Sequence, residues 1–191
     1  MKSVRLILIL AVLAAPLLPA QVRAQDERQG IGAVLDFINK LSGPRMLGPS
    51  ASYFHTLGSG PRLRISVGYL TAVGSDDVID PDGSSVQALT LAPVLEVPLG
   101  GSPVELAAGV RFHRFSGDLA DPFWHWSIPG RLQGRFPLGG AASGLRLRLA
   151  AGVEYFPEFG AADFDPLVVD VKTDGGEFTF VAQVGFDWVL R

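Results

Sequence analysis

Residues 144–156, GLRLRLAAGVEYF, alternate between two kinds of side chain with a period of two. The odd positions carry leucine, alanine, valine and tyrosine, whereas the even positions are mostly arginine, glutamate and small residues. Successive side chains of a β-strand point to opposite faces, so this segment is predicted to form a strand with one apolar and one polar face. The need to give each face a suitable environment constrains the fold more than any other feature of the chain.

The same alternation recurs along the chain in segments of about ten residues or somewhat more, which is typical of a membrane barrel that is apolar outside and polar inside. Short turns such as PLGGSP and TDGG alternate with longer acidic connections such as GSDDVIDPDGS, as in up-and-down barrels. The predicted fold class is therefore all-β, an antiparallel up-and-down transmembrane β-barrel. We predict about eight strands, at residues 49–57, 62–73, 85–98, 103–116, 122–137, 144–157, 165–172 and 177–190.

The beginning of the chain has the composition of a secretory signal peptide. Lys2 and Arg5 form a positive region, and an apolar run follows at residues 6–18. Val22 and Ala24 then place small residues at the positions that signal peptidase recognises. We expect residues 1–24 to be the signal peptide, the mature protein to leave the cytoplasm, and its location to be the cell outer membrane.

Composition excludes several other functions. The net charge of −3 makes a nucleic-acid partner unexpected. The chain has no cysteine, so it has no disulfides, zinc–thiolate sites or cysteine nucleophiles. The acidic segment 76–82 contains a DPDG turn but lacks the full spacing of a calcium loop, so we interpret it as a solvated turn. No metal and no cofactor is predicted.

Residues 33–41, AVLDFINKL, break the strand pattern, because their apolar residues recur at helical spacing and the following SGP ends the segment. We predict a polar segment and short amphipathic helix within residues 25–44, followed by a β-barrel domain at residues 45–191. With these eight strands, both termini fall at the end of the long connections, which is unusual for a bacterial barrel. The alternative is that 165–172 belongs to a loop and another strand lies before residue 49. The apolar positions of the predicted helix are Val34, Phe37, Ile38 and Leu41.

The polar face of the strands carries an excess of arginine over acidic residues. The interior of a narrow eight-stranded barrel is filled by side chains, and buried charges there must pair. We therefore predict a salt-bridged network that plugs the lumen. An anion-selective pore lined by arginine is the alternative, and it would need more strands. The predicted network consists of Arg62, Arg64, Glu96, Glu105, Arg111, Arg131, Arg135, Arg146, Arg148, Glu154 and Asp187.

The segment His125-Trp126-Ser127 is the only one that looks catalytic. Two residues that are two positions apart lie on the same face of a strand, so the histidine could accept the proton of the serine hydroxyl. This His-x-Ser resembles the motif of outer-membrane lipid A deacylases, which are also small barrels. The resemblance implies hydrolysis of an acyl ester together with a glutamate. In this chain the pair is predicted to face inward, and the next glutamate along the chain is Glu154.

As a whole, the signal peptide, the absence of cysteine, the alternating strands, the glycine-rich turns and the aromatic last strand resemble small outer-membrane β-barrel proteins of Gram-negative bacteria. The OmpA transmembrane domain and OmpW typify this family. The resemblance covers residues 45–191 and implies outer-membrane lipid, lipopolysaccharide and the barrel-assembly machinery as partners. The last strand departs from the usual form, because Val189, Leu190 and Arg191 follow its final aromatic residue, Trp188.

The resulting functional prediction is a non-catalytic outer-membrane barrel with an envelope-structural, surface or small-solute role. Two alternatives remain. One is the lipid A deacylase-like hydrolase that uses His125 and Ser127. The other is a soluble periplasmic barrel that binds an apolar ligand as lipocalins do, which requires the apolar face to point inward and Arg146 and Arg148 to face water.

Overall fold

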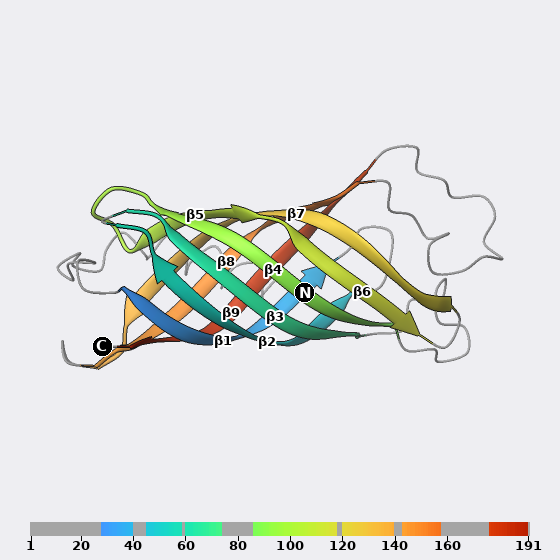
Figure 1. The fold of residues 1–191 in the computed structure, drawn as a ribbon, viewed down its shortest axis with the longest axis horizontal. Coiled ribbons are helices and arrows are strands. Elements are labelled where there is room, and N and C mark those ends of the chain that lie inside the picture. The colour runs from blue at the N-terminus through green and yellow to red at the C-terminus, as the bar shows by residue number, and fades with distance from the viewer. Residues whose placement is uncertain are drawn as a thin grey trace, which may run out of the picture.

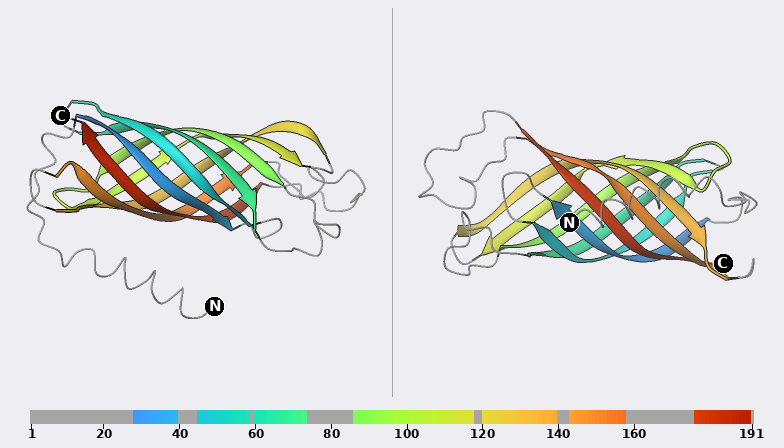
Figure 2. Two further views of the ribbon diagram at one scale, coloured as in Figure 1. Left: turned by 90° about the horizontal axis from the view of Figure 1, so that it is seen from below. Right: turned by 180° about the vertical axis from the view of Figure 1, so that it is seen from behind.

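The computed structural model describes residues 28–39, 45–58, 60–73, 86–117, 120–139, 143–157 and 176–190. They form a closed barrel of antiparallel strands that run obliquely around its axis (Figures 1 and 2). In these ranges no helix is long and apolar enough to cross a membrane. The strand segments are β1 (Gln29–Asn39), β2 (Met46–Thr56), β3 (Arg62–Ala72), β4 (Gln87–Pro98), β5 (Val104–Gly109), β6 (Arg111–Gly117), β7 (Ala120–Pro137), β8 (Leu145–Phe156) and β9 (Glu177–Leu190).

Each strand pairs with its neighbours in the sequence, and pairing of β1 with β9 closes the barrel. β5 and β6 pair with β4 and β7 in one continuous register, so they are two parts of one strand and the barrel has eight strands. The interruption lies at Val110, opposite Pro93. Val110 N donates to Pro93 O at 3.1 Å, but proline has no N–H to return the second bond of the pair. The predicted all-β, eight-stranded barrel is confirmed.

Seven of the eight predicted strands coincide with β2, β3, β4, β5 together with β6, β7, β8 and β9. Residues 165–172, the remaining predicted strand, lie outside the described residues, as do the predicted signal peptide and the acidic segment 76–82. β8 pairs with β9 along its whole length, so the barrel closes through the described strands.

The predicted helix at residues 33–41 is wrong, because residues 29–39 form β1, which pairs with both β2 and β9. The barrel therefore begins at Gln29 instead of residue 45. Val34 and Ile38 do share a face, as the helical spacing required, but that face is the interior of the barrel and also holds Asp36. β1 is the additional strand before residue 49 that the alternative arrangement required.

The extra strand also resolves the placement of the termini. β1 begins and β9 ends at one end of the barrel, which we call the terminal end, on the left of Figure 1. The short connections after β2, β4 and β7 lie at this end. We call the opposite end, where β8 ends and β9 begins, the far end. The start of β1, the end of β9 and the short turns thus share one end, as is usual in bacterial barrels.

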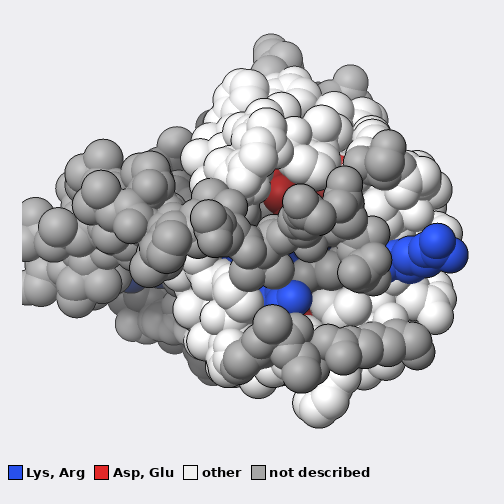
Figure 3. All heavy atoms as spheres, turned by 90° about the vertical axis from the view of Figure 1, so that its left-hand side faces the viewer, with Lys and Arg blue, Asp and Glu red and all other residues white. Residues whose placement is uncertain are grey.

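The alternation predicted from the sequence sets the two faces of the barrel wall. The outward positions carry large apolar side chains that are exposed, such as Val67 at 52%, Val153 at 52% and Phe186 at 50%. The inward positions are buried and mostly polar or charged. Viewed onto the terminal end, arginine or lysine atoms and acidic atoms are visible inside a rim of uncharged atoms (Figure 3).

Candidate functional site

The charged interior of the barrel is the candidate functional site. The structure places all eleven charged residues of the predicted network on the inner face, and the most exposed of them, Arg146, is at 9%. Sequence reasoning missed a further interior carboxylate, Asp36, because it assigned that segment to a helix. Asp36 is exposed by only 4%.

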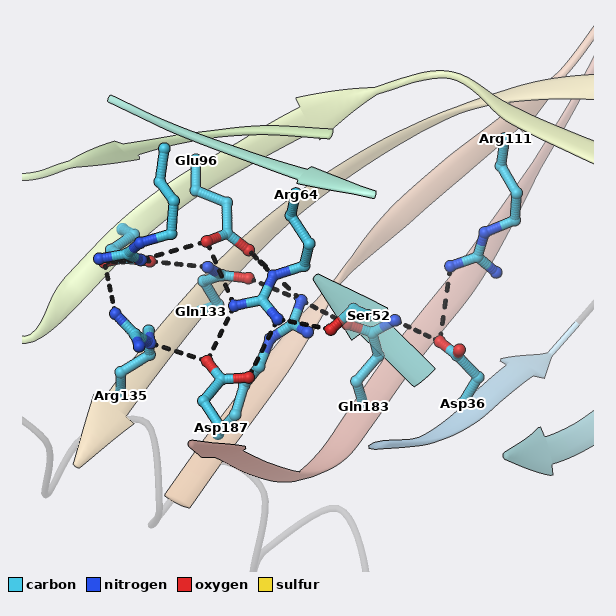
Figure 4. A network of polar contacts seen from close by, with 12 residues as sticks. Asp36, Ser52, Arg64, Glu96, Arg111, Gln133, Arg135, Gln183 and Asp187 are labelled. Carbon is cyan, nitrogen blue, oxygen red and sulfur yellow. Dashed lines mark hydrogen bonds and ion pairs between the residues drawn. The ribbon is translucent and has the colours of Figure 1, made fainter. Parts of the chain in front are cut away.

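Arg64 lies at the centre of the network and joins opposite sides of the lumen (Figure 4). Its Nε donates to Glu96 Oε1 at 2.5 Å, and its Nη2 donates to Asp187 Oδ2 at 2.8 Å. A third bond of 2.7 Å runs from Nη1 to Ser52 Oγ. Since Arg64, Glu96 and Asp187 have no exposed surface, these charges are compensated by one another rather than by water.

Two more arginines extend the network toward the wall formed by β4, β5 and β7. Arg62 Nη1 lies 2.9 Å from Glu105 Oε1 and 3.1 Å from Glu96 Oε2. Arg135 Nε donates to Asp187 Oδ2 at 2.8 Å. Every carboxylate in this part of the lumen therefore contacts at least two arginines, because Arg135 also lies 3.9 Å from Glu105.

The ring of Phe54 packs against these arginines. Its ring is fully buried, and the guanidinium carbons of Arg62, Arg64 and Arg135 lie 5.1, 4.8 and 4.8 Å from the ring centroid. At these distances the negative face of an aromatic ring attracts a cation. Room for the network comes from Gly32, where a Cβ atom would overlap the Asp187 carboxylate.

A second group of polar residues lies nearer the middle of the barrel. Asp36 accepts hydrogen bonds from Ser50 and Gln183 and forms an ion pair with Arg111 at 3.5 Å. Gln183 Oε1 in turn accepts a bond of 3.0 Å from Arg148 Nη2, which also lies 3.6 Å from Glu96 Oε1. Arg148 therefore links this group to the Arg64 network.

Ser127 is part of the same interior, and its partners differ from the predicted one. Its Oγ lies 2.8 Å from Nε2 of His113 on β6 and forms a hydrogen bond with Glu154 on β8. The predicted histidine, His125, stands opposite His113 in the β6–β7 register and stacks on Phe156 at 6.2 Å. Sequence reasoning missed His113, although the pairing of segments 103–116 and 122–137 could have indicated it.

The geometry of this trio does not match a hydrolytic triad. In a triad the acid holds one imidazole nitrogen while the other faces the serine. Here Nε2 of His113 faces both Ser127 and Glu154, the latter at 3.3 Å, and Nδ1 has no hydrogen-bond partner in the described part of the chain. All three side chains have no exposed surface, so a substrate outside the barrel does not reach Ser127 in this structure.

Toward the far end the lumen becomes apolar. A cluster of buried hydrophobic side chains fills it beyond His113, whose ring stacks on Phe115 at 5.3 Å. This interior packing completes a lumen that is charged near the terminal end and apolar near the far end. The cluster consists of Ile38, Met46, Leu70, Val86, Ala88, Phe115, Phe156 and Val181.

Two arginines of the predicted network lie apart from the Arg64 group. Arg146, near the terminal end, donates to the backbone oxygens of Ser143 and Leu145 at 2.8 and 3.1 Å. Arg131 lies deeper, with an exposed fraction of 3%, and its Nε and Nη1 have no hydrogen-bond partner among the described residues. No group of residues able to hold a metal ion occurs in the described ranges.

The closed eight-stranded wall with an apolar outer and a charged inner face defines a small barrel of the outer-membrane type. Comparison with solved structures finds the same architecture in the outer membrane protein OprG from Pseudomonas aeruginosa. The match has a TM-score of 0.50 and 9% sequence identity, and it covers 88% of this chain and 98% of that one. At this identity the likeness shows the fold. The sequence matches no protein-family model, and no curated protein matches it significantly.

The soluble ligand-binding alternative requires the inverse of the observed register. In that alternative Arg146 and Arg148 face water and the leucines of the same strand face the interior. In the structure, the exposed fraction of Arg148 is instead only 1%, whereas Val153 on the opposite face of β8 is half exposed. The observed register is therefore the inverse of the one that the lipocalin-like alternative requires.

Proposed function

We propose that this chain is a non-catalytic outer-membrane β-barrel protein with an envelope-structural role. The observation that supports this proposal best is the belt of large exposed apolar side chains around the wall, together with the burial of arginines and carboxylates inside it. Soluble monomers rarely expose such a large continuous apolar surface, whereas membrane barrels require one.

The form of the lumen favours a structural role over that of an open pore. Arg64, with its partners Glu96 and Asp187, spans the interior near the terminal end. Closer to the far end, Leu70 and the apolar side chains around it fill the lumen. A barrel of this size has little interior volume beyond its own side chains, so both halves oppose the passage of ions.

The partners in this proposal follow from the same surface. Outer-membrane lipid contacts the apolar belt, and lipopolysaccharide surrounds the protein on the outer leaflet. The barrel-assembly machinery inserts the chain, with β9 and its outward Phe186 and Trp188 as the last strand to be recognised. Removal of residues 1–24 during export belongs to the same proposal.

Fractionation of a Gram-negative host that expresses the full chain tests the proposal. We expect the protein in the outer membrane after a urea wash, with an electrophoretic mobility that changes when the sample is boiled. N-terminal sequencing should begin at Gln25. Recovery of the protein in the soluble periplasm would overturn the proposal.

The closed lumen is tested separately in planar lipid bilayers. The purified barrel should show no sustained conductance in salt solution. The double variant Arg64→Ala, Leu70→Ala, which removes a central side chain from each half of the lumen, should conduct more than the wild type. Sustained wild-type conductance would contradict the structural role and favour a solute pathway instead.

A further inference from the structure

Among the described residues, the interior of the barrel holds more positive than negative charge. Seven arginines and five carboxylates are buried in the described strands. Arginine stays charged in proteins, so this excess cannot be relieved by loss of a proton. Something else must compensate it, since an isolated buried charge is costly.

The excess is concentrated at Arg131 on β7. Five other interior arginines form ion pairs with carboxylates: Arg62, Arg64, Arg111, Arg135 and Arg148. Arg146 lies near the terminal end and binds backbone oxygens. Arg131 has no ion pair within the described structure, and two of its three guanidinium nitrogens are buried without a hydrogen bond.

The surroundings of Arg131 supply no compensation. Its direct cross-strand neighbours are Ala107 on β5 and Gly152 on β8, neither of which has a polar side-chain group. Arg111, Arg148, Asp36 and Glu154 are the charged groups that act on it, and neither carboxylate forms an ion pair with it. The guanidinium is therefore buried near two other arginines, with two of its nitrogens unpaired in the described structure.

We propose that Arg131 binds a small monovalent anion, of the chemical class of chloride, inside the barrel. The anion accepts hydrogen bonds from the free Nε and Nη1 atoms of Arg131 and offsets the repulsion from Arg111 and Arg148. The site is independent of the membrane location proposed above, because it depends only on the interior of the folded barrel.

Thermal or urea unfolding of the purified wild-type barrel at increasing chloride tests the site, with ionic strength held constant by gluconate, which is too large to enter. Ligand that binds only the folded state lowers the apparent unfolding constant about tenfold for each tenfold rise in ligand above its Kd. We expect this dependence for chloride and bromide. Equal stability in chloride and gluconate would overturn the proposal.

Three variants locate the effect. Arg131→Gln should abolish the chloride dependence, whereas the matched control Arg146→Gln, near the terminal end, should keep it. Ala107→Asp places a carboxylate directly opposite Arg131 and should make unfolding independent of chloride by replacing the anion. If Arg131→Gln does not fold, a bromide-soaked crystal of the wild type decides: anomalous density beside Arg131 supports the site, and its absence refutes it.

Discussion

Arg64 and Asp187 are 123 residues apart in the sequence and are joined across the lumen by two hydrogen bonds of 3.0 and 2.8 Å. One residue lies on β3 and the other on β9, so the pair fastens two strands that are not neighbours in the barrel. The pair exists only when the barrel is closed. Its contribution to the free energy of unfolding therefore reports on closure itself.

Removal of one partner of this pair should be strongly destabilising. Asp187→Asn leaves Arg64 with a buried charge that is only partly compensated, and such changes cost about 3–5 kcal/mol. In the double variant with Arg64→Met, the two losses should not add, with a coupling energy of about 0.5–3 kcal/mol. Urea unfolding in detergent measures all three variants. Strict additivity would show that the two side chains do not interact in the folded protein.

A second prediction concerns the close approach of β9 to β1. Gly185 faces the interior, and a Cβ atom there would overlap the backbone oxygen of Ala33. Because the obstacle is backbone rather than a flexible side chain, Gly185→Ala should destabilise the barrel by about 1–3 kcal/mol. Gly60, in the turn after β2, has nothing within 4 Å of such an atom and provides the matched control. Equal urea midpoints for Gly185→Ala and Gly60→Ala would contradict the prediction.

The Ser127 cluster gives a third prediction. Ser127→Ala should leave the acyl-chain pattern of lipid A unchanged, as measured by mass spectrometry of lipid A from cells that express the protein. The same variant should lower stability by about 1–3 kcal/mol, because Glu154 loses a buried hydrogen bond. His125→Ala, which changes the histidine of the His-x-Ser segment, should likewise leave lipid A unaltered. Loss of acyl chains that depends on Ser127 would establish the hydrolase alternative.

The sequence was sufficient to predict most of the wall, because a period of two decides which face each side chain occupies once a strand exists. Leu145, Arg146, Leu147 and Arg148 show this most clearly. The same rule failed at β1, where Val34 and Ile38 satisfy both a helical spacing and the inner face of a strand. Long-range pairing with β2 and β9 decides between these structures, and no local pattern contains that information.

The composition of the interior was also predictable, but its contacts were not. Alternation alone assigns Arg64, Glu96 and Asp187 to the lumen. Which carboxylate meets which arginine depends on strand tilt and register, and these are set when the barrel closes. The same reason explains why His113 rather than His125 lies at Ser127, since the register of the β6–β7 pairing decides which side chains meet.

The apolar belt leads to a fourth prediction that tests the membrane location of the barrel. Val67 lies in the middle of β3, faces outward and is 52% exposed. In water, Val67→Arg would be nearly neutral, since surface substitutions usually change stability by less than about 0.5 kcal/mol. In the hydrocarbon core, an outward arginine near the midplane costs about 2–4 kcal/mol.

The matched control for this variant is Leu57→Arg in the turn after β2, where the side chain is 48% exposed. At this position, beyond the end of the strand, the cost of arginine should fall to about 0–1 kcal/mol. Unfolding of both variants by urea in lipid vesicles measures the difference directly. A large loss at Val67 with a small loss at Leu57 places the belt in the bilayer. Equal small losses would mean that the outer face of β3 contacts water and that the protein does not span a membrane.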